Sequence, residues 1–281
     1  MARIRVITDS ASDLPEAEAS RLDIDVVSLS IRFGSEESVD RVDLSPKEFW
    51  AKCKTSKTLP ETSAPSAGAF QAAYERAKAD GCDGVLVVTL SSLLSATYQA
   101  ATLAAEAVRG VIDVRVVDTL NVSMGQGLIA IDIAELAATG ASLAEIHERT
   151  MSLLPKSGVV GTLDTLEHLI KGGRIGGAKA LIGQVLSIKP LVELKGGVVA
   201  EAGRQRTRAK ALAAVARTTA THAPLRRLAL VHGACTEADV ATLLGLAAEI
   251  KSEFPIIVTD IGPVVGTHAG PGIIALTFVE S

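Results

Sequence analysis

Hydroxyl side chains gather in two short segments of this 281-residue chain. The first segment reads Thr62-Ser63-Ala64-Pro65-Ser66, and the second begins at Ser91-Ser92 and continues through Ser95-Ala96-Thr97-Tyr98. Each segment precedes a stretch that is expected to be helical. The first turn of a helix carries unpaired N–H groups and a partial positive charge, so hydroxyls placed there either cap the helix or help to bind an anion. The two segments therefore predict either two helix caps or the polar end of an anion site.

Two aspartates form a second candidate for chemistry, in the segment Thr8-Asp9-Ser10-Ala11-Ser12-Asp13. This segment follows a strand-like run. Asp9 and Asp13, which flank hydroxyl groups, could hold a metal ion or take part in phosphoryl transfer. The alternative is an Asx-type turn in which Asp13 caps the next helix. No second acidic cluster stands nearby in the sequence to complete a Mg²⁺ site.

Two glycine-rich stretches resemble nucleotide loops only in part. The run from Lys171 to Lys179 lacks the Lys followed by Ser or Thr that ends a phosphate loop. Gly125-Gln126-Gly127 lies well beyond the strand that is expected to end at Val117, whereas a dinucleotide loop begins at a strand end. The sequence therefore predicts no nucleotide site.

One histidine stands out from the five in the chain. His268 is expected in a loop, because the segment from Gly262 to Gly272 is rich in glycine and proline. Glycines let the backbone approach a ligand closely, which favours a His268 side chain that points into a site. The other histidines show no spacing typical of metal ligands, and the serines include no GxSxG motif of a hydrolase.

The composition limits the class of protein. The chain is 48% hydrophobic but only 3% aromatic, so we expect a core of aliphatic side chains. Its net charge of −4 does not favour nucleic-acid binding, which needs a basic surface. The sequence leads directly into a strand and shows no signal peptide or membrane-spanning run. Cys53, Cys82 and Cys235 form no CxxC motif. These features predict a cytoplasmic protein with reduced thiols.

Strands and helices are expected to alternate in the first half of the chain. The expected strands are 4–7, 26–31, 85–89 and 114–117, and the expected helices are 15–21, 46–53, 66–79, 95–108 and 124–138. This alternation predicts a parallel sheet with helices on its faces. The carboxyl ends of parallel strands meet at one edge, where ligands commonly bind.

The second half of the chain has a different pattern. A hairpin is expected from 188–194 and 198–200, with helices at 207–221 and 238–251 and strands at 228–231, 256–258 and 273–279. A hairpin among helices favours a mixed sheet. Pro155-Lys156-Ser157-Gly158 interrupts the pattern, so we predict two α/β domains, an N-terminal one at 1–155 and a C-terminal one at 156–281.

Seven motifs taken together resemble the DegV family in order and spacing. They are ITDSASDLP, TSAPS, SSLLSATYQAA, VVDT, GGRIGGAKALIG, SIKPLVEL and GPVVGTHAGPG, and they span nearly the whole chain. The resemblance implies a two-domain α/β fold that binds a long-chain fatty acid between its domains. It also implies the role of an acyl-carrying, non-catalytic subunit of a bacterial fatty acid kinase. In that role a separate kinase subunit phosphorylates the bound carboxylate with ATP.

The resemblance also implies roles for individual residues. Ser95, together with Thr62 or Ser63, would hold the carboxylate, and His268 and Arg174 would complete a polar network at the tunnel mouth. Ser91 and Ser92 would support this site, and Arg206 would dock the kinase subunit.

The chain departs from the family pattern at three positions. Leu93 and Ala96 replace the two glycines of SSGLSGTY, and Ala64 replaces the Gln of TSQPS. A leucine at a glycine position of positive φ would be strained. We therefore expect these changes to affect the geometry around the head group.

The sequence predicts a lipid-binding protein with a long-chain fatty acid as ligand, and no cofactor or metal. Contact with a membrane is expected to be transient and at its surface. Two alternatives stay open: a metal-dependent hydrolase or phosphotransferase that uses Asp9 and Asp13, and a binding domain for a different apolar acid.

Overall fold

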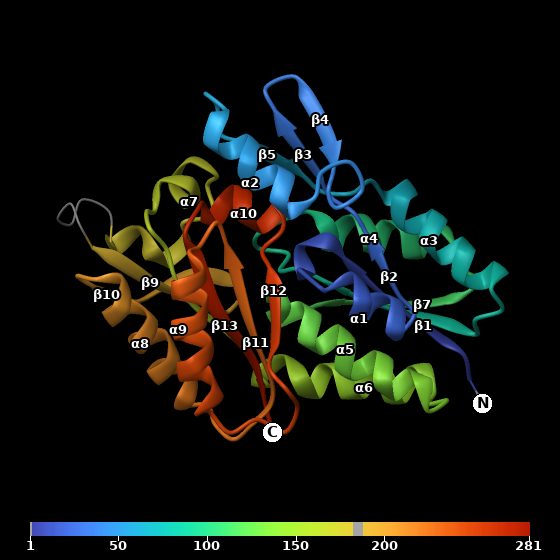
Figure 1. Ribbon diagram of the computed structural model, residues 1–281. Helices are drawn as coiled ribbons and strands as arrows, with labels where there is room; N and C mark the ends of the chain where they lie inside the picture. The colour runs from blue at the N-terminus through green and yellow to red at the C-terminus, as the bar shows by residue number, and fades with distance from the viewer. Residues whose placement is uncertain (1, 182–187) are drawn as a thin grey trace.

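The computed structural model describes residues 2–181 and 188–281. Two sheets lie side by side, each with its own helices, and a smaller sheet projects from the region where they meet (Figure 1). This arrangement confirms the predicted α/β class, with a parallel sheet in the first half and a mixed sheet in the second. Ile182 and Gly183 of the glycine-rich motif and Ser187 of the following motif lie outside the described residues.

The first sheet is parallel, with strand order β2-β1-β6-β7. Its strands are β1 (Ile4–Asp9), β2 (Ile24–Val27), β6 (Gly84–Thr89) and β7 (Asp113–Asp118). Every residue of β6 is buried, because helices cover both faces of the sheet. Val85 and Val87 pack with α3 (Ala67–Ala79) and α4 (Thr97–Ala107). Leu86 and Val88 face the opposite helices, α5 (Met124–Ala138) and α6 (Leu143–Leu153).

The second sheet has the order β10-β9-β8-β13-β11-β12, and its only parallel pair among the described residues is β11 with β12. Its strands are β8 (Ser157–Thr162), β9 (Lys189–Lys195), β10 (Val198–Gln205), β11 (Leu225–Gly233), β12 (Ile257–Asp260) and β13 (Ile273–Glu280). Helices α8 (Arg208–Ala220) and α9 (Glu237–Ala248) cover one face. Helix α5 packs against the other face.

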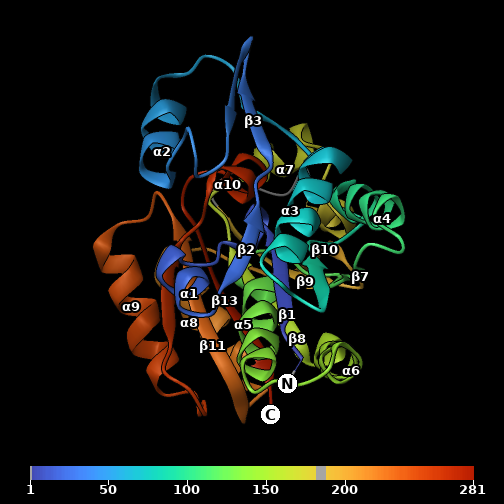
Figure 2. The same cartoon turned by 90° about the vertical axis from the view of Figure 1, so that its right-hand side faces the viewer.

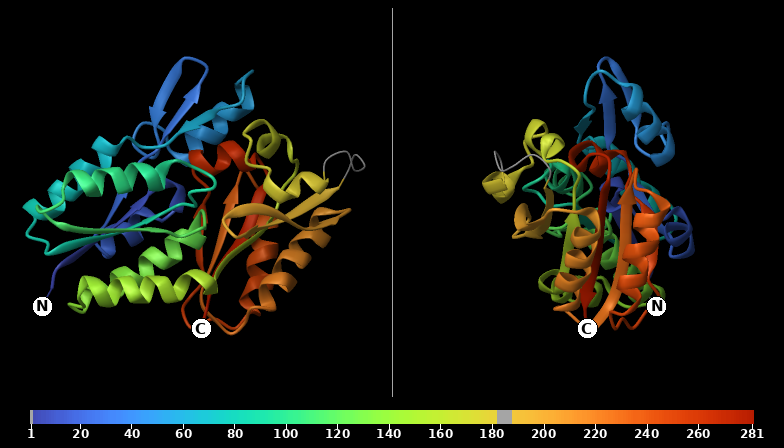
Figure 3. Two further views of the ribbon diagram at one scale, coloured as in Figure 1. Left: turned by 180° about the vertical axis from the view of Figure 1, so that it is seen from behind. Right: turned by 60° about the vertical axis from the view of Figure 1, so that its left-hand side comes forward.

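Helix α5 is therefore enclosed between the two sheets. It contacts β1 and β6 of the first sheet and β8, β11 and β13 of the second. Residues 124–134 are all buried, which explains why apolar residues surround this helix, and its buried polar side chains Gln126 and Asp132 are hydrogen-bonded. Figure 3 shows α5 and α6 along the lower edge of the molecule, next to the strands of the second sheet. The two halves thus share one core through α5.

The small sheet was not predicted from the sequence. It is antiparallel, with the order β4-β3-β5, and consists of β3 (Ser30–Phe33), β4 (Glu36–Val39) and β5 (Glu61–Ser63). The predicted single strand 26–31 is wrong, because the chain leaves the first sheet after Val27 and enters the small sheet at Ser30. Figure 2 shows β3 and α2 (Pro46–Thr55) standing above α10 (Pro263–Ala269).

Two other expectations at helix ends are wrong. His268 lies on α10 rather than in a loop, because Pro263 begins a helical turn there and Gly270 ends it. Asp13 does not cap α1 (Glu16–Arg21), whose first residue follows Pro15 without a side-chain cap. The short helix α7 (Glu167–Lys171) completes the set of described α-helices. The domain boundary after residue 155 stays a prediction, and β8 begins next to it at Ser157.

Candidate functional site

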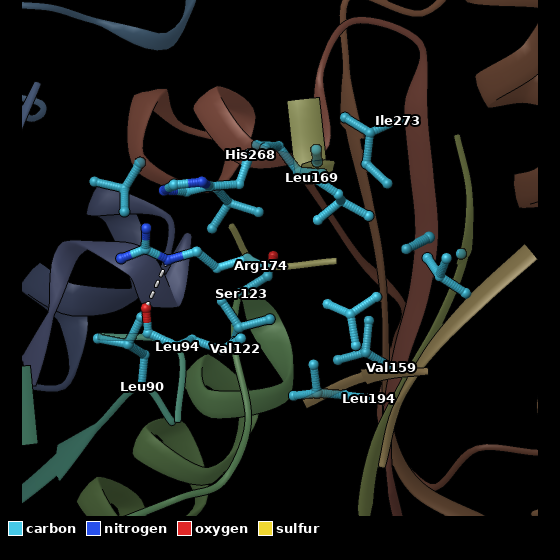
Figure 4. Close-up of a pocket in the computed structure, with 18 of the residues that line it drawn as sticks. Leu90, Leu94, Val122, Ser123, Val159, Leu169, Arg174, Leu194, His268 and Ile273 are labelled. Atoms are coloured by element: carbon cyan, nitrogen blue, oxygen red, sulfur yellow. Dashed lines mark hydrogen bonds between the residues drawn. The ribbon is translucent and has the colours of Figure 1, made fainter. Parts of the chain in front are cut away.

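One cavity lies between the two halves of the molecule, under α10 and beside the second sheet (Figure 4). It has about 900 Å³ of empty space, counted out to its open mouth. Six of its lining residues carry polar side chains: Thr62, Ser95, Ser123, Arg174, Glu193 and His268. The rest of the lining is aliphatic or glycine: Leu29, Leu90, Leu94, Val122, Val159, Gly161, Leu163, Leu169, Val192, Leu194, Val199, Val231, Ile261, Val264, Val265, Ala269, Ile273 and Ala275.

Polar and apolar side chains occupy different parts of this cavity. Figure 4 shows Arg174 and His268 together on one side, whereas Val159, Leu194 and Ile273 lie on the other. The aliphatic wall comes from β8, β9 and β13, strands whose buried residues also form the core. A cavity of this kind suits a ligand with one polar end and a long apolar remainder.

The polar end is assembled from four segments that are distant in the sequence. Oγ1 of Thr62, on β5, lies 2.8 Å from Nε2 of His268. The Arg174 guanidinium donates from Nε to the Leu94 carbonyl at 3.0 Å and from Nη1 to the Gly172 carbonyl at 2.6 Å. Oγ of Ser95 lies 2.9 Å from Oγ1 of Thr97. The small sheet, α10, the segment after α7 and the start of α4 each contribute one of these groups.

Burial and a nearby positive charge set the protonation of His268. Burial, together with the nearby Arg174 guanidinium and His168, lowers the pKa of His268 from its ordinary value of 6.5 to about 4. The imidazole is therefore neutral at pH 7 and can donate from only one of its nitrogens. Within the described part of the chain, its buried Nδ1 atom has no hydrogen-bond partner.

Two glycines of the segment that resembles a phosphate loop have a steric role. A Cβ atom at Gly172 would lie 2.4 Å from Nδ1 of His268. Gly176 has a φ of +50°, and a Cβ atom there would lie 2.4 Å from the Val199 carbonyl oxygen. The absence of side chains at these positions lets the segment approach α10 and β10 closely, so that Arg174 enters the cavity.

The structure brings Thr62, Ser95, Arg174 and His268 to one cavity, and their roles toward a carboxylate stay a prediction. Ser63 is exposed on β5 and does not line the cavity. The expected strain at Leu93 is absent, because Leu93 does not have a positive φ.

Ser91 and Ser92 act on the turn that carries Ser95. The buried Ser91 hydroxyl donates to the Gly197 carbonyl at 2.7 Å, and the Ser91 carbonyl accepts from Ser95 N–H at 3.2 Å. Ser92 N–H donates to Asp118 at 3.2 Å. Ser91 thus links the β9–β10 hairpin to the turn after β6 by a hydrogen bond. Arg206, the residue expected to dock a kinase subunit, is exposed between β10 and α8.

The two aspartates of the alternative reading lie outside this cavity. Asp9 and Asp13 have no exposed surface, and burial raises the pKa of Asp9 to about 7. Asp9 accepts from Ala11 N–H, Leu90 N–H and the Gln126 amide, which is an Asx-type turn with two further donors. Among residues 2–181 and 188–281, no group of three or more His, Cys, Asp or Glu side chains is placed to hold a metal ion.

Sequence reasoning missed Ser123, which lines the cavity at the start of α5. Its backbone has a φ of +56° and a ψ of −148°, a conformation that is rare for any residue except glycine. A serine before a helix usually indicates a simple cap, but this side chain makes no cap bond. In the sequence, Ser123 therefore looks like an ordinary capping serine, and only the structure shows its unusual backbone and its contacts.

The fold and the cavity define a mixed α/β protein with a largely aliphatic cavity between its two sheets. A family model described as "Uncharacterised protein, DegV family" matches residues 3–281, and the chain belongs to this family. A DegV domain-containing protein of Deinococcus radiodurans is 36% identical over 281 residues, with 97% of both chains covered.

Two solved structures show the same fold. One is a DegV family protein from Thermus thermophilus described for its fatty acid binding, with a TM-score of 0.91, 33% identity, and coverage of 99% of this chain and 100% of that one. The other is DegV from Bacillus subtilis, described as a fatty acid binding protein, with a TM-score of 0.88, 28% identity and full coverage of both chains. In the part of the chain that the structure describes, no helix has the length and apolar character needed to cross a membrane.

Proposed function

We propose that this protein binds a long-chain fatty acid in the cavity, with the carboxylate at the end formed by Thr62, Ser95, Arg174 and His268. The observation that carries the proposal is the division of the cavity into one polar end and an aliphatic remainder. The similar proteins from Thermus thermophilus and Bacillus subtilis, both described in terms of fatty acid binding, support it.

The polar end supplies what a carboxylate requires when it leaves water. An unpaired buried charge is costly, and hydrogen bonds to an ionised group are among the strongest in proteins. Arg174 brings the positive charge. When Nε2 of His268 donates to Thr62, the Thr62 hydroxyl is free to donate to the carboxylate. When Thr97 likewise donates to Ser95, the Ser95 hydroxyl is also free to donate to the carboxylate.

The aliphatic walls supply the free energy for the tail. Each buried methylene contributes about 0.8 kcal/mol. A dozen methylenes therefore contribute on the order of 10 kcal/mol before the costs of ordering the chain are subtracted. Outside the polar end, the walls are made of Leu, Val, Ile and Ala side chains, and Ser123 and Glu193 are the other polar side chains of the described lining.

We further propose that the bound carboxylate is presented to a separate kinase subunit in the cytoplasm, which phosphorylates it with ATP. The sequence contains no nucleotide loop of its own, and Arg206 is exposed and available for docking. The variant Arg206→Ala tests this role. We expect it to lower the phosphorylation of the bound fatty acid by an added kinase subunit. Fatty acid affinity should not change, because Arg206 does not line the cavity.

Lipid extraction followed by mass spectrometry tests the first proposal. The purified protein is expected to release a long-chain fatty acid, and the delipidated protein is expected to bind an added fatty acid with one site per chain. Recovery of no fatty acid, together with no binding of added fatty acid, would overturn the proposal. A different apolar acid in the extract would instead support the alternative of another ligand class.

A further inference from the structure

Asp13 occupies the point where the first half of the molecule meets α10. Its side chain is 1% exposed, and its carboxylate accepts hydrogen bonds from three segments. Oδ1 accepts from Gly262 N–H at 2.8 Å and from the Arg41 guanidinium at 3.2 Å. Oδ2 accepts from the Ser123 hydroxyl at 2.6 Å. Asp13 itself has a φ of +52°, in the left-handed region that aspartate visits more readily than most residues.

The bond to Gly262 fixes the start of α10. Gly262 is the residue before the first turn of this helix, and α10 is only seven residues long. The Trp50 indole also bonds at this end, to the Ile261 carbonyl at 3.2 Å. His268 lies one residue before the other end of the helix. A shift or rotation at Gly262 would therefore move the imidazole relative to Thr62.

The bond to Ser123 fixes the start of α5 and one part of the cavity wall. Ser123 N–H donates to the Ala11 carbonyl at 2.8 Å, and the Ser123 hydroxyl is held by Asp13. A serine keeps a φ of +56° with a ψ of −148° only where its surroundings impose it. Strained residues of this kind cluster at functional sites, and Ser123 faces the cavity.

A buried carboxylate in this position can hold the three segments in a fixed arrangement. If one of them moved away, a buried hydrogen-bonding group would be left without its partner, which is costly, so the arrangement resists small displacements. The only positive charge in contact with Asp13 among the described residues is Arg41, whose side chain is 23% exposed. The three donors come from β4–α2, from the start of α5 and from the start of α10, and no other described carboxylate bridges these segments.

We propose that Asp13 is a positioning residue for the head-group site, one that holds α10 and the start of α5 in the arrangement where His268 meets Thr62. The ligand-binding part of this inference rests on the proposed fatty acid binding. The positioning part concerns the protein alone and is tested without a ligand.

The experiment compares Asp13→Asn with Asp132→Asn. Asp132 is also a buried carboxylate, with a side chain that is 2% exposed, but its partners are Arg149 and Arg226. The same chemical change at Asp132 therefore removes no bond to α10 or to Ser123. The first readout is the ¹⁵N NMR titration of the His268 ring in the ligand-free protein. Asp13→Asn is expected to raise the pKa of His268 by at least one unit towards its ordinary value, because the imidazole loses its buried position, and Asp132→Asn is expected to leave it unchanged.

Fatty acid affinity is the second readout. We expect at least a tenfold loss for Asp13→Asn and less than a threefold loss for Asp132→Asn. An unchanged His268 titration in a folded Asp13→Asn protein would overturn the inference. If wild-type protein binds no fatty acid, the proposed function fails, but a shifted His268 titration would still support the positioning role.

Ser123→Gly keeps the inference testable if Asp13→Asn does not fold. Glycine adopts the backbone angles of Ser123 without strain, so this variant removes the bond to Asp13 and preserves the fold. It is expected to shift the His268 titration in the same direction as Asp13→Asn by a smaller amount. A His268 titration identical to that of the wild type would count against the network.

Discussion

Thr62 and His268 stand 206 positions apart in the sequence, yet Oγ1 of Thr62 lies 2.8 Å from Nε2 of His268. The pair joins the small sheet to α10 at the lining of the cavity. Because the imidazole is neutral, this bond orients a hydroxyl without adding a second positive charge beside Arg174.

Removal of the head-group hydroxyls is expected to weaken fatty acid binding. Thr62→Val and Ser95→Ala each delete one donor to the carboxylate, and a lost hydrogen bond to a charged group costs roughly 1.5–3 kcal/mol. We expect an affinity loss of about tenfold or more for each variant, measured by displacement of a fluorescent fatty acid. Ser63→Ala is the matched control, since Ser63 is exposed one position away on β5. An equal loss in Ser63→Ala would contradict the assignment.

Replacement of Arg174 is expected to abolish selectivity for the acid. Arg174→Met keeps the unbranched apolar stem of the side chain and removes its charged end, so the carboxylate loses its positive partner. Binding of a fatty acid should weaken by at least tenfold, whereas binding of the fatty alcohol of equal length should change little. Calorimetric titration with both ligands measures the ratio. A parallel loss for acid and alcohol would show that Arg174 only maintains the cavity.

Protonation of His268 is expected to destabilise the folded protein in acid. The unfolded chain takes up a proton near the ordinary pKa of 6.5, whereas the folded chain does so only near 4. The contribution of the neutral imidazole to the free energy of unfolding is therefore complete above pH 6.5 and is lost as the pH falls to about 4. At pH 5 the loss amounts to about 2 kcal/mol.

Urea unfolding at pH 7 and pH 5 measures this contribution. His268→Gln should lose less stability between the two pH values than the wild type, by roughly the same 2 kcal/mol. His147→Gln, on α6 and outside the cavity lining, controls for the loss of one histidine. The same pH dependence in wild type and His268→Gln would rule out a buried neutral imidazole.

A larger side chain at the apolar end is expected to shorten the acyl chain that fits. Val159 lies on β8, on the side of the cavity opposite Arg174 and His268 (Figure 4). Val159→Phe should reduce affinity for long-chain acids more than for medium-chain acids, because the ring occupies the space of the terminal methylenes. Val258→Phe makes the same change at an exposed position of β12 and should affect neither. A uniform loss across chain lengths in Val159→Phe would place the tail elsewhere.

The sequence pattern was sufficient to predict the alternating strands and helices of the first sheet. The apolar run of β6 and the amphipathic helices around it predict a parallel sheet, because each residue's environment is set by near neighbours in the chain. The small sheet was not predicted, since β3, β4 and β5 are only three or four residues long and β5 pairs with β3 through contacts distant in the sequence. Helix α10 was not predicted because the glycines and proline of its segment are typical of loops. In the structure Gly266 packs against Phe49 and Trp50, and the absence of a side chain there lets the helix approach these rings.

The candidate site was accessible from the sequence only through the family resemblance. Spacing alone could not place Thr62 beside His268 or Arg174 beside Leu94, because both contacts depend on how two sheets meet. The strain expected at Leu93 did not arise, since its backbone does not have a positive φ. The residue with the unusual backbone is instead Ser123, which no sequence pattern marks.

The most direct test of the central claim is an NMR titration with a fatty acid labelled with ¹³C at its carboxyl carbon. We predict a single bound carboxyl resonance at one equivalent per chain, which remains that of an ionised carboxylate at pH values where the free acid takes up its proton. Arg174→Met should shift this resonance and raise its pKa. A protein that gives no bound resonance, or one whose bound resonance is the same in wild type and Arg174→Met, would contradict the account.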